Sequence, residues 1–303
     1  MIRTVLIIGG SGAIGTHLAL KLREGYKVFA TYNDHPTAIP GVTTIPMRLA
    51  NRSAGKQVLT LVRPDFIVYA AGSQNIEWAE RNAREAERAH TAGAGGVSMV
   101  SGIAPPRLIY LSSSYVFDGV RGNYHEQDTV LPHTMLGKCK LGGENFVRGK
   151  SVNHVVLRLG QVLGRGNGIR TTFFDELRIR LGRGERFQLS QNEIHSYVPI
   201  WGVVDVVSRL IEGGPKNKII HYGGLTKLSA FDLGRRFAKR FGFDPGLITP
   251  KLVSLGRRMQ DESDAKTYDF SLNSSQIIES LKIKPLLLEE SFDLIEQKLV
   301  TGA

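Results

Sequence analysis

Three glycines near the start of the chain have the spacing of a phosphate-binding turn. Gly9, Gly12 and Gly15 form a GxxGxxG pattern between the strand-like run Thr4–Ile8 and the helix-like run Thr16–Leu22. Their missing side chains let the backbone approach a pyrophosphate, and the N-terminus of a following helix offers N–H groups and a positive dipole end to phosphate. A ligand-free turn is the alternative. The residues predicted to form this dinucleotide site are Gly9, Gly12, Ala13, Ile14 and Gly15.

The end of the second predicted strand bears on the choice between NAD and NADP. In NAD-preferring sites an acidic residue at this place binds the ribose hydroxyls. Here Tyr32 or Asn33 occupies the place, and Asp34 lies just beyond it. Arg48, after the third predicted strand, suits either a 2′-phosphate contact or a solvated surface. The pattern slightly favours NADP over NAD.

The elements that position these residues alternate between strands and helices. Further strands are predicted at Lys27–Thr31, Val42–Ile45, Phe66–Ala70, Leu108–Leu111 and Val155–Leu159. Helices are predicted between them, including Trp78–Ala94 and Leu136–Val147. Parallel strands need crossover connections, and helices in those connections cover both faces of the sheet. We therefore predict the α/β class, with a Rossmann-type, doubly wound parallel sheet.

Length and composition fit a Rossmann domain with an appended lobe. The 303 residues are 42% hydrophobic and 22% charged, which excludes a disordered or collagen-like chain. We predict an NAD(P)-binding Rossmann domain over residues 1–160 and a smaller, mixed C-terminal substrate-binding lobe over residues 161–303. Some late segments are expected to return to the first domain. Ligands of open parallel sheets bind beyond the carboxyl ends of the strands, so this lobe would cap the crevice.

Charge and cysteine content narrow the partners. A net charge of +11, from 39 Lys and Arg against 28 Asp and Glu, favours anionic partners such as phosphorylated cofactors or nucleotide sugars. A nucleic-acid partner ranks behind, because no aromatic platform accompanies the charge. The single cysteine excludes an internal disulfide, the eight histidines lack metal-site spacing, and the apolar runs are too short for a membrane span. We expect a cytoplasmic protein, and a homodimer is left open.

Longer motifs resemble one protein family. They are Arg63-Pro64-Asp65, Ala70-Ala71-Gly72, LSSSYVFDG at residues 111–119, the loop residues Tyr124, Glu126, Asp128 and Pro132, KLGGE at residues 140–144, SLN at residues 271–273 and LKIKP at residues 281–285. With these motifs nearly the whole chain resembles the extended short-chain dehydrogenase/reductases, and within them the dTDP-4-dehydrorhamnose reductase branch. The resemblance implies a nicotinamide cofactor contacted by Ala70, Ala71 and Gly72, and reduction of a nucleotide-linked 4-keto sugar.

The same resemblance implies a set of catalytic residues that this chain keeps only in part. In the family a tyrosine and a lysine, four residues apart on one helix, transfer the proton, and a serine or threonine at the end of the fifth strand assists. Ser113 matches the hydroxyl, and Lys140 matches the lysine, which also binds the nicotinamide ribose. Leu136 stands where the tyrosine should be, and none of the nine tyrosines has a lysine four residues later. The family's asparagine loosely corresponds to Thr91.

Leucine cannot donate a proton to the alkoxide that hydride transfer creates. Loss of a positioned acid typically lowers the rate by about 10² to 10⁴. Tyr115, Tyr124 and His133 are conceivable replacement acids, although packing and loop hydrogen bonds are the simpler roles. Cys139 lies between two lysines that would lower its thiol pKa, yet a small residue packed on the sheet is the simpler interpretation.

Six arginines gather at the start of the second region. In the family this region meets the nucleotide diphosphate of the substrate, and guanidinium groups suit phosphate. A solvated basic helix is an equal alternative. The six arginines are Arg165, Arg170, Arg178, Arg180, Arg183 and Arg186.

Two classes of function therefore remain. The first is an NAD(P)-dependent reductase of a nucleotide-linked keto sugar with a degenerate catalytic site. The second is a catalytically inactive, cofactor-binding regulator or partner subunit. The whole-chain resemblance favours the first, and Leu136 favours the second; fold similarity cannot decide between them.

Overall fold

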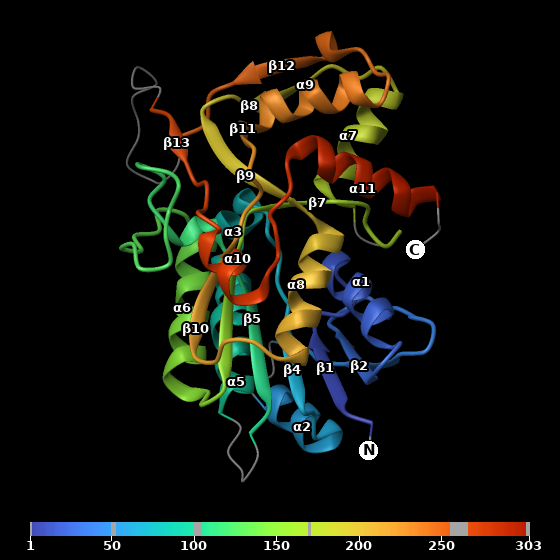
Figure 1. Cartoon of the computed structure of the whole chain (residues 1–303), viewed down its shortest axis with the longest axis vertical. Helices are drawn as coiled ribbons and strands as arrows, with labels where there is room; N and C mark the ends of the chain where they lie inside the picture. Colours follow the sequence, from blue (N-terminus) through green and yellow to red (C-terminus); the bar gives the residue numbers. More distant parts are fainter. Residues whose placement is uncertain (1, 50–52, 100–104, 169–170, 255–265, 301–303) are drawn as a thin grey trace.

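The computed structural model describes residues 2–49, 53–99, 105–168, 171–254 and 266–300 (Figure 1). Its centre is a seven-stranded sheet in the order β10-β6-β5-β4-β1-β2-β3, and every pairing in it is parallel. The strands are β1 (Thr4–Ile8), β2 (Lys27–Tyr32), β3 (Thr43–Pro46), β4 (Phe66–Tyr69), β5 (Arg107–Ser113), β6 (His154–Leu159) and β10 (Lys218–Tyr222). The predicted α/β class and doubly wound parallel sheet are confirmed.

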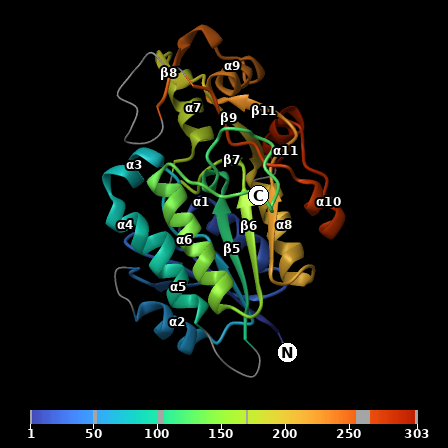
Figure 2. The same cartoon turned by 90° about the vertical axis from the view of Figure 1, so that its left-hand side faces the viewer.

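Helices cover both faces of this sheet because its central strands are apolar on both sides. On one face lie α1 (Ala13–Leu22), α8 (Ile200–Glu212) and α10 (Ser275–Leu281), whose buried side chains share a core cluster with Val5 and Ile7. On the other face lie α2 (Ala54–Val62), α5 (Gly93–Ser98) and α6 (Met135–Lys150), with α5 and α6 in front of the sheet in Figure 2. The sheet is therefore a buried central layer.

A second lobe lies beyond the carboxyl ends of the strands (Figure 1). It contains β9 (Glu193–Pro199), paired with β7 (Gln161–Leu163), β11 (Lys227–Ser229) and β13 (Tyr268–Asp269), and the separate pair β8 (Phe187–Ser190) and β12 (Ile248–Lys251). The helices α7 (Phe173–Gly182), α9 (Ala230–Arg240) and α11 (Leu288–Val300) pack around an aromatic core. Between these segments the chain returns to the large sheet through α8 and β10.

The helix predicted at Trp78–Ala94 is instead a broken run. The observed segments are α3 (Ile76–Arg81), α4 (Ala83–Glu87), the π-helical turn η1 (Arg88–Ala92) and then α5. Asn82 interrupts the run, with φ −124° and ψ 51°, and its side-chain amide donates to the Trp78 carbonyl. Alternating Ala and Glu residues carry no signal for such a break, because it depends on tertiary contacts at the π turn.

A buried ion pair ties α6 to the sheet. The Arg158 guanidinium on β6 donates to both Glu144 carboxylate oxygens, at 2.9 and 2.8 Å, and the Ser112 hydroxyl donates to the same carboxylate at 2.5 Å. Arg158 and Glu144 are almost fully buried. Bidentate geometry with an added hydroxyl satisfies charges that would otherwise be costly to bury. The pair therefore fixes the helix that carries Leu136 and Lys140.

Across the described residues, no helix is long and apolar enough to cross a membrane. In the same part of the chain, no three His, Cys, Asp or Glu side chains are grouped so that they could hold a metal ion.

Candidate functional site

In the glycine turn between β1 and α1, two of the three glycines are packed too tightly for a side chain, and the third is less crowded. Gly9 has φ +89°, and a Cβ there would lie 2.6 Å from Ala71 Cα. A Cβ at Gly15 would lie 2.3 Å from the Gly9 carbonyl oxygen. At Gly12 a Cβ meets only that oxygen, at 3.3 Å. Gly9 and Gly15 are therefore required for packing, whereas Gly12 faces the space that a pyrophosphate needs.

The N-terminus of α1 supplies the electrostatic part of this site. Gly12 is its N-cap, with φ −78° and ψ 166°, and its first turn carries no acidic side chain. The N–H groups of Ala13, Ile14 and Gly15 are first-turn donors without an intrahelical acceptor. These donors and the helix dipole favour an anion here, so the residues present fit a dinucleotide pyrophosphate.

A loop from the second lobe reaches the same turn. The Asn167 amide, in the loop after β7, donates to the Ser11 carbonyl at 2.9 Å and to the Thr16 hydroxyl at 2.8 Å. This loop is fixed by α7, because the Gly166 N–H donates to Asp175 of the Thr172 capping box. The second lobe therefore touches the glycine turn, a contact that the sequence pattern did not indicate.

The structure brings Tyr32 and Arg48 together at the end of β2. The Met47 N–H donates to the Tyr32 carbonyl at 2.8 Å, and the Leu49 N–H donates to the Asn33 side-chain oxygen at 3.2 Å. Arg48 lies between these two anchored residues and is exposed. Arg48 is therefore an exposed cation close to the end of β2, and its contact with a 2′-phosphate stays a prediction.

Ala70, Ala71 and Gly72 lie directly beside the glycine turn. The Ala70 N–H donates to the Ile8 carbonyl at 2.8 Å. Gly72 has φ +100°, and a Cβ there would lie 2.2 Å from the His90 ring. His90 was not among the residues predicted for this site. It is fully buried in the π turn, and its Nε2 lies 2.9 Å from the Ser73 carbonyl oxygen. A buried lysine of the predicted site affects the pKa of His90 through its charge.

That lysine is Lys140, which is buried against β5. Its Nζ donates to the Leu111 carbonyl at 2.9 Å, and the side chain is 2% exposed. Burial lowers the pKa of Lys140 to about 7, against the opposing attraction of Glu144. Burial and the charge of Lys140 together lower the pKa of His90 to about 3. Thr91, the loose match for the family's asparagine, donates its hydroxyl to the Cys139 carbonyl at 2.8 Å.

Leu136 lies one helical turn before Lys140 inside an apolar cluster. It is 0% exposed, and the cluster includes Ala79, Ala86, Cys139 and Phe270. Burial raises the pKa of the Cys139 thiol to about 11, which agrees with the simpler interpretation of Cys139 as a packed residue rather than an activated thiol. This part of α6 is a filled hydrophobic contact without a titratable donor at position 136.

Ser113 and Tyr115 lie at the end of β5 and lead into a polar cluster. The Ser113 hydroxyl accepts from the Tyr115 N–H at 3.3 Å. The Tyr115 hydroxyl donates to Glu193 Oε1 at 2.7 Å and lies 3.2 Å from His195 Nε2. Burial and the Glu193 charge raise the pKa of Tyr115 well above 10. Tyr115 is therefore a protonated phenol held by residues of β9.

The other two replacement acids have different surroundings. Tyr124 is 3% exposed, donates its hydroxyl to Asp118 and stacks on Phe117 with 4.1 Å between ring centroids. His133 is exposed in the loop before α6 and acts on Asp118 only through its charge. Among the three candidates, Tyr115 lines a cavity.

This cavity has a volume of about 740 Å³ and lies between the two lobes. Its walls come from α3, the 3₁₀ turn η2 (Ser114–Val116), the start of α6, β7, β9 and the β8–β12 pair. Its buried and half-buried polar residues, which we call the floor, are Tyr115, Thr134, Gln161, Ser190 and Glu193. Its exposed charged residues, which we call the rim, are Glu77, Glu80, Arg81 and Lys251. The cavity thus combines these polar groups with an apolar lining from Ile76, Leu189, Ala230 and Val253.

The arginine group of the second lobe does not line this cavity. Arg180 pairs with Glu176 and Glu185, and Arg183 pairs with Glu185, on the α7 surface. Arg180 also lies over the Phe187 ring, at 4.1 Å from its centroid. Arg170 lies outside the described residues. For Arg180 and Arg183, these pairs with neighbouring carboxylates favour the alternative of a solvated basic surface over a diphosphate contact.

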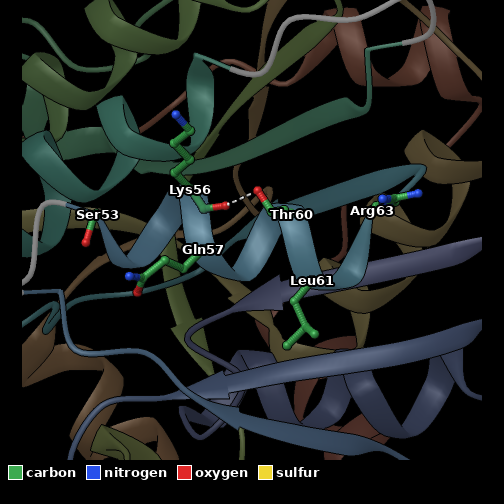
Figure 3. A pocket seen from close by; sticks show the side chains of 6 residues that line it. All are labelled: Ser53, Lys56, Gln57, Thr60, Leu61 and Arg63. Atoms are coloured by element: carbon green, nitrogen blue, oxygen red, sulfur yellow. Dashed lines mark hydrogen bonds between the residues drawn. The ribbon is translucent and has the colours of Figure 1, made fainter.

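A second hollow, of about 810 Å³, is lined by α2 and its two ends. Figure 3 shows that Lys56 and Leu61 point away from one another on opposite sides of the helix, and that Arg63 lies at the far end from Ser53. Side chains that diverge cannot close around one ligand. The cavity between the lobes is therefore the better candidate site.

The fold and the glycine turn define a Rossmann-type protein with a lobe that caps the carboxyl end of the sheet. Residues 3–266 match the family described as RmlD substrate binding domain, and the chain belongs to this family. This confirms the family resemblance inferred from the motifs.

Relatives of known sequence include two differently named groups. Methionine adenosyltransferase 2 subunit beta of Bos taurus is 28% identical over 260 residues, which cover 82% of this chain and 75% of that protein. The dTDP-4-dehydrorhamnose reductase of Mycobacterium tuberculosis is 24% identical over 253 residues, which cover 81% of this chain and 78% of that protein. One group is named as a reductase and the other as a subunit.

Solved structures support the fold over almost the full length. The dTDP-4-dehydrorhamnose reductase of Bacillus anthracis, in complex with NADP, superposes with a TM-score of 0.78 at 21% identity, covering 98% of this chain and 99% of that chain. The UDP-glucose 4-epimerase of Thermotoga maritima superposes with a TM-score of 0.79 at 20% identity, with 99% of each chain covered. The architecture is therefore dTDP-4-dehydrorhamnose reductase-like.

Proposed function

We propose that this chain binds NAD(P) at the glycine turn and does not carry out reduction through the family's phenol on α6. The observation that carries the proposal is Leu136, which is 0% exposed in an apolar cluster one turn before Lys140. An alkyl side chain sealed from water can neither donate a proton nor position one. The chain then acts as a cofactor-binding regulator or partner subunit.

Cofactor binding rests on the intact first part of the site. Gly9, Gly12 and Gly15, with the first-turn N–H groups of α1, would hold the pyrophosphate, and Arg48 would pair with a 2′-phosphate. Solved neighbours crystallised with NADP or NAD support a nicotinamide dinucleotide. When bound, such a cofactor supplies a hydride. NADPH is expected to bind at least as well as NADH, because no acidic side chain ends β2.

A role as partner subunit is supported by one group of relatives. Methionine adenosyltransferase 2 subunit beta is named as a subunit of another enzyme, and it aligns with most of this chain. In this role, cofactor binding sets the conformation of the two lobes, and a protein partner recognises that conformation. The contact of the Asn167 loop with the glycine turn supports this role, because it would couple ligand binding there to the second lobe.

Calorimetry and a turnover assay test the proposal together. The purified chain is expected to bind NADPH, and NADPH oxidation with dTDP-4-dehydrorhamnose is expected to run at least about 10²-fold slower than in a reductase that has the phenol. No heat of NADPH binding would overturn the cofactor assignment. Robust turnover by the unmodified chain would overturn the loss of reduction.

Leu136→Tyr is the matched gain-of-function variant. It returns a phenol to α6, one turn before Lys140, and is expected to raise turnover above that of the parent chain. Leu136→Phe adds the same ring without the hydroxyl and is the control. An equal rise in both variants would show that the effect comes from packing rather than from proton donation.

The Tyr115 cluster favours a second candidate function, a reductase with a relocated acid. The Tyr115 hydroxyl lines the cavity and is held by Glu193 and His195. In this alternative Tyr115 donates its proton to the alkoxide formed from a keto sugar. Turnover by the parent chain that falls at least about 10²-fold in Tyr115→Phe would support it.

A further inference from the structure

The floor of the cavity between the lobes carries negative formal charge. Among the described residues that line it, Glu193 is the ionised group of the floor, and the other polar groups are Tyr115, Thr134, Gln161 and Ser190. Burial alone would raise the pKa of Glu193, but hydrogen bonds with His195 and Tyr115 outweigh it and hold that pKa below its usual value. The floor therefore presents a carboxylate and uncharged hydrogen-bonding groups.

The charged groups at the rim balance one another. Arg81 pairs with Glu77, with 3.8 Å between the nearest atoms. Glu80 accepts from the Met135 N–H at 2.7 Å, and Lys251 acts on Glu193 by its charge. Two cations and two carboxylates leave no excess positive charge at the entrance. A phosphate that entered the floor would meet the Glu193 carboxylate, and like charges in a half-buried site repel. The cation that acts on Glu193 is Lys251, which is exposed at the rim and already counters the carboxylate charge.

Ser190 provides an independent sign that the floor is built for a ligand. It is 7% exposed and lines the cavity at the end of β8. Its hydroxyl oxygen has no hydrogen-bond partner within the described part of the chain. Buried polar groups are nearly always paired, so an unpaired hydroxyl beside a cavity indicates a group that a ligand completes.

We propose that the floor binds a small polyhydroxy compound without phosphate, a sugar or cyclitol whose hydroxyls pair with Glu193 and Ser190. A carboxylate has about four acceptor sites, and Tyr115 and His195 take two of them, so Glu193 can still accept ligand hydroxyls. Ser190 can both donate and accept. This ligand class differs from a nucleotide sugar, and the proposal stands independently of cofactor binding at the glycine turn.

Two variants separate binding from folding. Ser190→Ala removes a hydroxyl that has no partner among the described residues, so it is expected to leave the unfolding midpoint unchanged. Glu193→Gln keeps the shape and removes the charge. Ser208→Ala is the matched control, because Ser208 lies on α8 and its hydroxyl donates to the Val204 carbonyl in the same helix.

Saturation-transfer NMR on the full chain measures the binding. The probes are methyl rhamnoside, methyl glucoside and myo-inositol, with dTDP-glucose as competitor. At least one probe is expected to bind, with an apparent affinity roughly three- to tenfold weaker in Ser190→Ala, more strongly weakened in Glu193→Gln and unchanged in Ser208→Ala. Displacement of the bound probe by dTDP-glucose, or no signal that depends on Ser190 from any probe, would overturn the proposal.

NADPH calorimetry on the same variants keeps the two proposals apart. Ser190→Ala and Ser208→Ala are expected to bind NADPH with the affinity of the parent chain. If sugar binding fails while NADPH binding persists, the cavity assignment is wrong and the cofactor assignment stands. If NADPH binding fails while a probe still binds in a manner that depends on Ser190, the reverse holds.

Discussion

The glycine turn and the middle of α6 differ in the chemical groups that they offer for cofactor binding and for proton transfer. Around the turn, a Cβ at Gly9 or Gly15 would collide with backbone atoms, whereas a Cβ at Gly12 would meet only the Gly9 carbonyl oxygen, at 3.3 Å. On α6, Leu136 is buried in an apolar cluster, while Lys140 donates to the Leu111 carbonyl. Binding and catalysis are therefore separable, because pyrophosphate recognition uses backbone groups and proton transfer depends on one side chain.

The largest expected effect breaks the binding half of this comparison. Gly12→Asp places a carboxylate where the pyrophosphate should lie. Gly12 has a negative φ, and a Cβ there would meet the Gly9 carbonyl oxygen at 3.3 Å, a contact that a small backbone shift relieves, so the fold is expected to survive. NADPH affinity should fall at least about 100-fold, equivalent to roughly 2.7 kcal/mol. Gly25→Asp, where a Cβ meets nothing within 4 Å, is the control for added charge. Unchanged affinity in Gly12→Asp, measured by calorimetry, would contradict the site.

The next effect concerns Lys140 and pH. In the unfolded chain the lysine has its ordinary pKa of 10.5, whereas in the folded chain burial lowers that pKa to about 7. Between pH 7 and 10.5 the unfolded state binds more protons than the folded state, so the free energy of unfolding rises with pH. The stability gained over this range is lost again as the pH falls to the folded-state pKa of about 7. The expected slope is at most about 1.4 kcal/mol per pH unit.

Lys140→Met isolates that slope. The variant keeps the length of the side chain and removes the titrating group, so the difference in free energy of unfolding between parent and variant should change by roughly 2 kcal/mol between pH 7 and 9. Urea unfolding at several pH values measures it. A difference that is independent of pH would show that Lys140 is charged and solvated in the folded chain.

A smaller effect tests how completely the catalytic position is filled. Leu136→Tyr adds a ring and a hydroxyl to a fully buried site, and overpacking of this kind typically costs about 1–3 kcal/mol of stability. Leu136→Met conserves volume and is expected to cost less than about 1.5 kcal/mol. Equal stability of the tyrosine variant and the parent would reveal a preserved slot for the phenol.

The smallest effect sharpens the choice of cofactor. Arg48 is exposed, so its contact with a 2′-phosphate is screened by solvent and is expected to contribute about 1 kcal/mol. Arg48→Ala should therefore lower NADPH affinity roughly fivefold and leave NADH affinity unchanged. Lys56→Ala, on α2, controls for the loss of a surface charge. A clear preference of the parent chain for NADH would instead point to Asp34 as the ribose ligand.

Much of the fold could be predicted because it depends on local patterns. The run Thr4–Ile8 is β1 with the same bounds, and the other predicted strands differ from β2 to β6 by at most two residues at either end. Period and apolarity define such strands. The break in Trp78–Ala94 could not be predicted, because hydrogen bonds from Tyr69 and Tyr110 to the carbonyls of Ala89 and His90 accompany the π turn.

The glycine pattern and the leucine at position 136 were evident without a structure, because each depends on residue type at a fixed local spacing. Their surroundings depend on tertiary contacts. These contacts place Tyr115 beside Glu193 and His195, which are 78 and 80 residues away in the chain, and leave the Ser190 hydroxyl without a partner among the described residues. Such contacts arise when β9 of the second lobe packs over the end of β5, and no local spacing encodes that meeting.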